Sequence, residues 1–368
     1  MNRFISQKFR FYSFVCIAAL LFVHGYNLKE TYLVPFSLVT ERLTFTTFFE
    51  YLFANGLLRF RIPMLFIISG YIFAMQDYKP YGERVKKRFK TLMIPYFIWS
   101  AVGLAVTFLW QQFPLTAEAV RMAQLDQLGD NRPYMEIGWG GILYRWALVP
   151  ISFQLWFIRS LFVYNLLYPF LKWVVLKYPI IWFCIVVFLW ITLANVLFIE
   201  GMGLTFFSAG IWLSKRNYPI DKKPEWFSRY ICWITFIGLS VIRTFMAFEF
   251  ESYHNVYIAA MLILQGVTVV AGILAVWFSA DAVVKWCMSR KWFVWLTAFS
   301  FVIFALHIPL LAYVMRLTTM FVHNMNGYRL LTYIFVPLAV LFFCVVVGAL
   351  LRKVLPGFYK IATGGRGF

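Results

Sequence analysis

Two histidines lie inside hydrophobic stretches of this chain. His24 follows the apolar run at residues 17–23, and His307 lies within another apolar run at residues 300–311. A charged side chain at the centre of a membrane costs about 2.5 kcal/mol or more, so such residues usually face a cavity lined by protein. Imidazole titrates near neutral pH and is the commonest general base. The two histidines therefore predict a membrane enzyme or a transporter.

Two arginines, Arg159 and Arg243, also fall within hydrophobic stretches. At a helical rise of about 1.5 Å per residue, and in the orientation inferred below, both arginines and both histidines lie in the outer half of the bilayer. Because scattered structural polar groups need not agree in depth, this agreement favours one shared site. Acyl transfer to a hydroxyl would use such residues: a histidine base, and Arg159 to stabilise the oxyanion. Alternatively, a histidine can bond a neighbouring helix, and an arginine near a span end can extend to the interface.

The elements that hold these residues are predicted to be transmembrane helices. The chain has 368 residues, 62% of them hydrophobic and 13% charged, whereas soluble domains average about 25% charged residues. An all-α, polytopic integral membrane protein with about ten transmembrane helices is the fold class that this composition predicts. The ten stretches are residues 11–27, 61–76, 92–113, 155–171, 180–198, 202–214, 230–248, 255–278, 293–315 and 330–351.

The net charge of +19 raises the question of nucleic-acid binding, but its distribution argues against it. If the N-terminus is cytoplasmic, most of the 34 Lys and Arg residues fall on the cytoplasmic side, including clusters at residues 79–90 and 215–223. This is the positive-inside pattern, and it places both termini in the cytoplasm. We therefore expect the lipid bilayer as a partner and no nucleic acid. The five cysteines show no CxxC spacing, so we expect neither a metal site nor a disulfide framework.

The domain organisation is predicted to be simple. Residues 1–351 read as one multi-span membrane domain and residues 352–368 as a short cytoplasmic tail. The most polar stretch, about residues 114–150, is predicted to be an extracytoplasmic loop with a piece lying on the membrane surface. Residues 44–58 look like a second interfacial helix. The first span lacks a small-residue cleavage site, so it is not expected to be a removable signal peptide.

Several stretches resemble one family in their order along the chain. They are residues 17–24 (IAALLFVH), 61–74 (RIPMLFIISGYIFA), 86–99 (KKRFKTLMIPYFIW), 155–171 (LWFIRSLFVYNLLYPFL), 206–216 (FFSAGIWLSKR) and 300–311 (SFVIFALHIPLL). Each is a weak apolar motif, but the ordered set resembles the acyltransferase family 3 membrane proteins, which O-acylate cell-surface glycans and related acceptors. The resemblance covers nearly the whole chain, and the ten-span arrangement of that family is similar to the count above.

The resemblance implies roles for several residues. It makes His24 the catalytic base. It also implies three residues that shape the site: Arg159, Ser69 and His307. Three further polar residues near these positions are candidates for substrate binding: Tyr26, Asn27 and Gln154.

The acyl donor implied by the resemblance is a coenzyme A thioester, most simply acetyl-CoA, with no bound cofactor. Its phosphates would meet the basic inner face, where Arg88 is a candidate contact. The family often carries an arginine eleven residues before the first-span histidine, where this chain has Ser13. Arg10, one turn earlier on the same helical face, is the candidate replacement.

The sequence thus predicts a multi-pass protein of the inner (plasma) membrane. Its predicted activity is O-acyl transfer, most simply O-acetyl transfer, from acyl-CoA to a hydroxyl of a surface polysaccharide or a lipid-linked saccharide. Two alternatives remain open. The protein could be a transporter or flippase of glycan precursors, with the same polar residues lining a path, or a non-catalytic subunit of an envelope-synthesis complex. Replacement of His24 should abolish an enzyme and hardly affect a scaffold.

Overall fold

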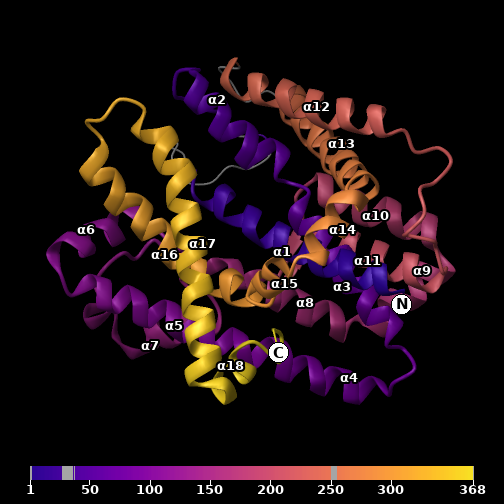
Figure 1. Ribbon diagram of the computed structural model, residues 1–368, viewed down its shortest axis with the longest axis horizontal. Coiled ribbons are helices and arrows are strands. Elements are labelled where there is room, and N and C mark those ends of the chain that lie inside the picture. Colours follow the sequence, from indigo (N-terminus) through magenta and orange to yellow (C-terminus); the bar gives the residue numbers. More distant parts are fainter. Residues whose placement is uncertain (1, 27–35, 37, 250–254, 368) are drawn as a thin grey trace. The chain divides into compact units, whose positions relative to one another are not determined.

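The structure is a computed structural model that describes residues 2–26, 36, 38–249 and 255–367 (Figure 1). Its regular structure is helical apart from one short antiparallel pair, β1 (Asn195–Val196) and β2 (Ile199–Glu200). The predicted all-α, polytopic fold class is confirmed at this level. Within the described residues, seven helical segments are long and apolar enough to cross a membrane: Arg3–His24, Phe45–Met75, Tyr81–Gln111, Arg229–Glu249, Asn255–Ser279, Ser300–Val322 and Tyr328–Val354.

Each of the ten predicted stretches overlaps helical structure, but four of them are interrupted or form short helices. The stretch at 155–171 is divided between α8 (Trp156–Leu166) and α9 (Tyr168–Lys177), since Pro169 cannot donate a hydrogen bond to the preceding turn. The stretch at 293–315 is divided between α15 (Lys291–Thr297) and α16 (Ser300–Val322). The stretches at 180–198 and 202–214 form α10 (Pro179–Ile191) and α11 (Gly201–Lys215). These helices are too short to count by length alone, so ten spans remain a prediction.

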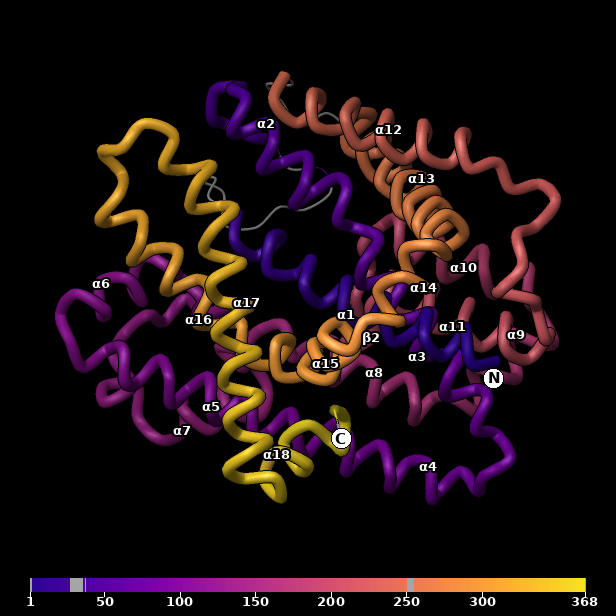
Figure 2. The backbone as a smooth tube through the Cα atoms, in the orientation of Figure 1, coloured from indigo at the N-terminus to yellow at the C-terminus, as the bar shows by residue number. Residues whose placement is uncertain are grey.

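The chain divides into two compact units, which the colours of Figure 2 help to follow along the sequence. Unit 1 comprises residues 1–19, 28–85 and 163–294, and unit 2 comprises residues 20–27, 86–162 and 295–368. Helices α1 (Arg3–His24), α4 (Tyr81–Arg88), α8 and α15 (Lys291–Thr297) contribute residues to both units. The other helices of unit 1 are α2 (Phe45–Tyr51), the π-helix η1 (Leu52–Leu57), α3 (Arg61–Met75), α9, α10, α11, α12 (Arg229–Glu249), α13 (Asn255–Ser279) and α14 (Asp281–Ser289). Those of unit 2 are the π-helix η2 (Phe89–Met93), α5 (Ile94–Gln111), α6 (Pro114–Ala123), α7 (Tyr134–Ala147), the 3₁₀-helix η3 (Phe153–Leu155), α16 (Ser300–Val322), α17 (Tyr328–Val354) and α18 (Pro356–Ala362).

In unit 1, α3 and α11 pack backbone against backbone through two glycines. A Cβ atom on Gly70 would lie 2.2 Å from the Phe207 carbonyl oxygen, and one on Gly210 would lie 2.2 Å from the Ile67 carbonyl oxygen. Small residues permit such close helix approach in membranes, where packing replaces the hydrophobic effect as the main attraction. The contact fixes the ends of α3 and α11 relative to each other.

Arg243 on α12 lies in the interior of unit 1. Its side chain is 1% exposed, and its Nη1 donates a hydrogen bond to the Asn55 carbonyl at 3.2 Å. Asn55 belongs to η1, and π-helical turns often expose a carbonyl that a regular helix would use. The side chain of Arg243 is therefore enclosed by protein.

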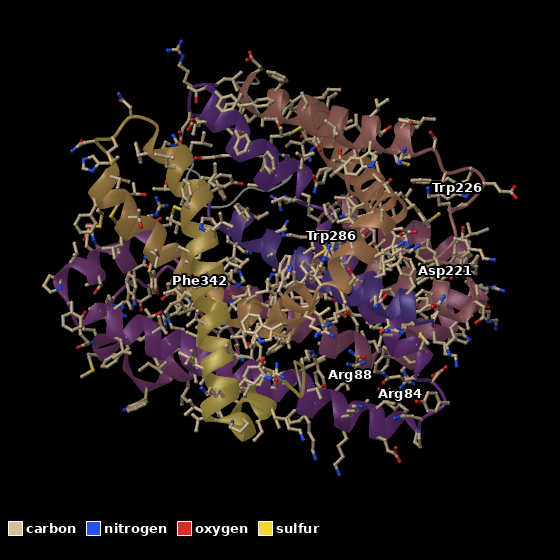
Figure 3. All side chains as sticks on the ribbon, viewed as in Figure 1. Arg84, Arg88, Asp221, Trp226, Trp286 and Phe342 are labelled. Carbon is tan, nitrogen blue, oxygen red and sulfur yellow. The ribbon has the colours of Figure 1, made fainter. Side chains whose placement is uncertain are left out.

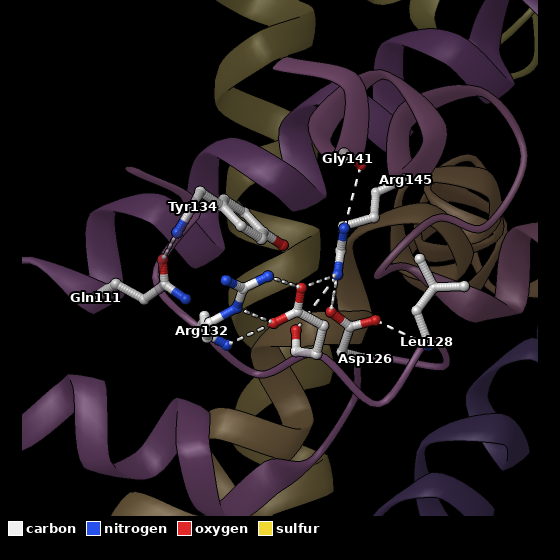
Figure 4. A network of polar contacts seen from close by, with 8 residues as sticks. Gln111, Asp126, Leu128, Arg132, Tyr134, Gly141 and Arg145 are labelled. Atoms are coloured by element: carbon white, nitrogen blue, oxygen red, sulfur yellow. Dashed lines mark hydrogen bonds and ion pairs between the residues drawn. The ribbon is translucent and has the colours of Figure 1, made fainter. Parts of the chain in front are cut away.

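In unit 2, the segment at 114–150 is a folded structure built on α6 and α7. A buried ion pair holds it together: Arg145 Nη2 lies 2.6 Å from Asp126 Oδ2, and both side chains are at most 5% exposed (Figure 4). Arg145 also donates to the Asp130 carbonyl, and the Asp130 carboxylate binds Arg132 (Figure 4). Ion pairs between charged side chains thus cross-link this segment.

The C-terminal segment folds back onto unit 2. Trp99 Nε1 donates to the Ala362 carbonyl at 2.8 Å, and Arg366 Nη1 donates to the Thr91 carbonyl at 2.9 Å. Gly364 has a positive φ of 61°, and a Cβ there would lie 2.4 Å from the Thr91 carbonyl oxygen. Only glycine satisfies both conditions.

Candidate functional site

His24 and His307 are in contact within unit 2. His24 is the last residue of α1 and is half-buried, whereas His307 on α16 is fully buried. Their ring centroids are 5.6 Å apart, with an angle of 31° between the ring planes. Phe153 packs edge-on against the His24 ring at 5.1 Å. Two imidazoles therefore share one partly enclosed site.

The tautomer of His307 follows from its hydrogen bonds. Its Nδ1 lies 3.0 Å from the Ile303 carbonyl oxygen and 2.8 Å from the Phe304 carbonyl oxygen. Carbonyl oxygens only accept hydrogen bonds, so Nδ1 must carry the proton. In the neutral ring, Nε2 is then the acceptor nitrogen.

A break in α16 directly follows His307. Ile308 has non-helical φ and ψ of −110° and 132°, and the Ile308–Pro309 peptide bond is cis. Pro309 has no N–H group, so it cannot bond the Ala305 carbonyl four residues earlier. The break exposes carbonyl groups in the turn that carries His307, and buried carbonyls need partners.

Gln154, in η3, supplies most of those partners. Its Nε2 donates to the carbonyl oxygens of Ala305 at 3.0 Å, Ile308 at 3.2 Å and Phe304 at 3.3 Å. Ser152 Oγ adds a bond of 2.9 Å to the Ile308 carbonyl. These contacts fix the amide orientation of Gln154, because only its nitrogen can face three acceptors.

The other end of the Gln154 amide is available as an acceptor. Gln154 is 2% exposed, and its Oε1 has no hydrogen-bond partner within the part of the chain that the structure describes. A buried unsatisfied acceptor costs free energy, so such groups in native proteins call for an explanation. A substrate hydroxyl that donates a hydrogen bond to Gln154 Oε1 would satisfy this oxygen.

The chain after His24 is confined by a close contact. A Cβ on Gly25 would lie 2.9 Å from Pro337 Cγ and 2.8 Å from the Leu21 carbonyl oxygen, so this position requires glycine. Tyr26 follows, is half-buried, and lies near Arg316 on α16. Asn27, the third predicted residue of this run, lies outside the described residues.

Arg159 belongs to the part of α8 that lies in unit 2. Its Nη1 donates to the Leu148 carbonyl, and the Tyr96 hydroxyl lies beside its guanidinium group. The Leu148 carbonyl, shortly before η3, and the Tyr96 hydroxyl on α5 thus orient the Arg159 side chain. Its role in stabilising an oxyanion remains a prediction.

Three predicted site residues lie elsewhere in the chain. Arg10 Nη2 donates to the Val294 carbonyl at 2.9 Å, and Ser69 is half-buried on α3 next to Gly70; both belong to unit 1. Arg88 ends α4 in unit 2 and is half-buried. Their predicted parts in donor binding and in shaping the site stay predictions.

Two residues near predicted site residues, Phe153 beside His24 and Arg316 beside Tyr26, were not predicted from the sequence. Phe153 looks like one more aromatic residue in a chain that is 21% aromatic, so nothing distinguished it. Arg316 carried a usable signal in the sequence, because it is a charged residue directly after the apolar stretch that contains His307. The predicted span ended at residue 315, and this boundary alone removed Arg316 from consideration.

Across residues 2–26, 36, 38–249 and 255–367, no group of three or more His, Cys, Asp or Glu side chains is arranged to hold a metal ion. The chemistry available at the histidines is that of acid–base residues and oriented backbone carbonyls.

Comparison with known proteins identifies the family. The acyltransferase domain family matches residues 14–352. A curated relative, the succinoglycan biosynthesis protein ExoH of Rhizobium meliloti (strain 1021), is 24% identical over 373 residues, an alignment that covers 100% of this chain and 94% of that protein. No solved structure matches the chain. The family match spans both histidines and most of both units, so the chain belongs to the acyltransferase family 3 of membrane proteins.

Proposed function

We propose that this protein transfers an acyl group, most simply acetyl, from acyl-CoA to a hydroxyl of a surface polysaccharide or a lipid-linked saccharide. Family membership supports acyl transfer, and the similarity to a succinoglycan biosynthesis protein supports a glycan acceptor. The contact between His24 and His307 is the single observation that carries the assignment of the reaction centre.

In the proposed mechanism His24 is the general base. The acceptor nitrogen of His307 would receive an N–H from the His24 ring, which leaves the second His24 nitrogen to take a proton from the substrate hydroxyl. Gln154 Oε1 would hold that hydroxyl in place. The histidine pair would then work as a base with an orienting partner, the arrangement common to many nucleophile-activating sites.

The transfer itself then needs two steps. The deprotonated oxygen attacks the thioester carbonyl, and Arg159 would stabilise the oxyanion of the tetrahedral intermediate. Collapse of the intermediate breaks the carbon–sulfur bond. The coenzyme A sulfur leaves and receives the proton held by His24, which restores the neutral base and releases the ester and free coenzyme A.

The proposal is tested by measuring base-labile acetate on surface glycans of cells that express the wild type, His24→Ala or His323→Ala at matched membrane levels. His323 is the control because it is also a histidine of the α16 region but is exposed. We expect acetate with the wild type and His323→Ala, and its loss with His24→Ala. Equal acetate in all three folded proteins would remove His24 as the base. If the wild type adds no acetate, esters of longer acyl groups are measured next.

A further inference from the structure

One carboxylate in unit 1 binds three cations. Asp77 follows α3, and its Oδ2 lies 2.6 Å from Lys172 Nζ and 2.7 Å from Lys215 Nζ. Its Oδ1 lies 2.9 Å from Arg84 Nη1. A single negative charge thus faces three positive charges, which leaves an excess of two positive charges among these four side chains. Figure 3 labels Arg84 on α4.

An open cavity of about 630 Å³ lies beside this cluster; we call it the Asp77 pocket. Arg84, Lys172 and Lys177 line it together with Asp77, and Lys177 adds a further positive charge. Tyr81 and Trp173 also line the pocket, and both are exposed. The lining therefore combines excess positive charge with accessible aromatic surface.

Arg84 is fixed within the wall of the pocket. Its guanidinium lies 4.0 Å from the Phe73 ring centroid and 4.5 Å from the Tyr168 ring centroid, and its Nη2 donates to the Phe73 carbonyl at 2.8 Å. The side chain is only 3% exposed. Arg84 is thus a rigid anchor for Asp77.

The lysines keep donors for a ligand. Lys172 is 40% exposed and has one hydrogen bond within the described part of the chain, to Asp77. An ammonium group has three N–H donors, so two of them can bind an anion. Burial raises the pKa of Asp77, but the hydrogen bonds from Lys172 and Lys215 outweigh it and hold the pKa at about 2. The carboxylate therefore stays charged at physiological pH and keeps the ammonium groups in place.

A purely structural explanation covers only part of this arrangement. Cations near the C-terminal ends of helices complement the helix dipole, and Lys177 and Lys215 are the last residues of α9 and α11. Dipole complementation does not require three cations to converge on one carboxylate, nor aromatic side chains at the rim of an adjoining cavity. Phosphates and a planar base are the ligand groups that match both features.

We propose that the Asp77 pocket binds the phosphorylated adenosine end of the coenzyme A donor. Lys172 and Lys177 would contact its phosphates, and Tyr81 and Trp173 would offer surface for the adenine. This inference rests on the proposed function for its donor. In the orientation predicted from the sequence, the ends of α3, α9 and α11 would lie on the cytoplasmic side, where coenzyme A is available.

The test measures the affinity of the purified full-length protein for coenzyme A by titration calorimetry, with pantetheine as a probe that lacks the phosphates. The variants are Lys172→Gln, Lys177→Gln and the control Lys222→Gln, an exposed lysine of the same unit outside the pocket. Lys177→Gln leaves the ion pairs of Asp77 in place, so it remains informative if Lys172→Gln fails to fold. We expect each pocket variant to weaken coenzyme A binding about tenfold, as for the loss of one charge-assisted contact to phosphate. Pantetheine binding and the control variant should be unchanged.

Each contrary result has a distinct meaning. If the wild type binds coenzyme A and both pocket variants bind it equally well, the pocket assignment is wrong and the proposed function is untouched. If the wild type does not bind coenzyme A, the donor in the proposed function is wrong as well. Binding of phosphatidylglycerol vesicles that depends on Lys172, without a matching effect on coenzyme A, would identify a lipid headgroup as the ligand and overturn the inference.

Discussion

Replacement of Gln154 by methionine tests whether its amide holds the turn that carries His307. Methionine is similar in length and apolar, so the change removes the donors with little change in volume. Three carbonyls lose a bond, but two of them keep another partner: Ile308 keeps Ser152, and Phe304 keeps the His307 ring. The Ala305 carbonyl has no helical partner, because Pro309 lacks an N–H group, so this carbonyl is the one left unsatisfied.

The magnitude follows from that one carbonyl. An unsatisfied buried acceptor costs about 1–3 kcal/mol, and single hydrogen bonds between membrane helices reach about 1.7 kcal/mol at most. We therefore expect Gln154→Met to lower the free energy of unfolding by about 1–2 kcal/mol. Acyl transfer should fall further than this loss of stability explains, because the His307 turn is no longer fixed and Oε1 is absent.

The assay is the unfolding midpoint of the purified protein in mixed micelles with increasing dodecyl sulfate, followed by tryptophan fluorescence. Gln112→Met is the matched control, because Gln112 also donates to a carbonyl, that of Phe108, but is exposed on unit 2. It should change stability by less than about 0.5 kcal/mol. Equal midpoints for the two variants would refute the role of Gln154 in holding the kinked turn.

Three further predictions concern stability. Gly70→Leu should lower the free energy of unfolding by about 3 kcal/mol, since its side chain would collide with backbone at the α3–α11 contact; thermal unfolding in detergent measures this. Arg145→Met should lower the free energy of unfolding by about 3–5 kcal/mol, because Asp126 stays buried without its partner. A strongly lowered melting temperature in detergent measures this loss. The pKa of Asp77 is about 2 in the folded state and about 3.9 in the unfolded state. The ionised carboxylate therefore stabilises the folded state above about pH 3.9, and this contribution is lost as the pH falls toward 2. Between pH 5 and about 2.5, the melting temperature should therefore decrease less steeply with falling pH for Asp77→Asn than for the wild type.

Matched variants separate these effects from general damage. Gly238→Ala, on α12, adds a methyl group into open space and should stabilise by about 0.5–1 kcal/mol, the opposite sign to Gly70→Leu. Arg121→Met breaks an exposed ion pair with Glu118 and should cost no more than about 1 kcal/mol. If Arg145→Met lowers the free energy of unfolding no more than Arg121→Met does, the buried ion pair between Arg145 and Asp126 contributes no more than an exposed one, and the reasoning is wrong. A parallel pH profile for wild type and Asp77→Asn would show that Asp77 is not the group that titrates.

The sequence was sufficient for most of the fold. Hydrophobic stretches of about twenty residues locate helices well, because the requirement for satisfied backbone groups in lipid leaves few other structures. Their lengths were harder to predict: Pro169 divides one stretch into α8 and α9, and α2 and η1 run on into α3 where an interfacial helix was expected. The division into two units depends on packing between distant segments, which no local pattern encodes.

For the site, depth in the membrane was the useful signal. His24 and His307 were placed at similar depth from helix rise alone, and the structure has them in contact. Arg243, judged to be at the same depth, lies in unit 1 and bonds Asn55, because depth gives no information about position within the membrane plane. The function of Gln154 as a partner for the α16 carbonyls could not be predicted either, since it depends on where Pro309 interrupts a helix 150 residues away.

The folded C-terminal segment has a practical consequence for anyone who handles this protein. Residues 363–367 lie against Thr91 and Ala298 through backbone contacts that tolerate only glycine at positions 364 and 367. Loss of residues 363–367 would remove the contacts that cover the Thr91 and Ala298 carbonyl groups. A purification tag or fluorescent reporter attached after residue 368 needs a flexible spacer so that it does not pull this segment away. Loss of yield on C-terminal tagging would therefore report on the docking of the segment and not on membrane insertion.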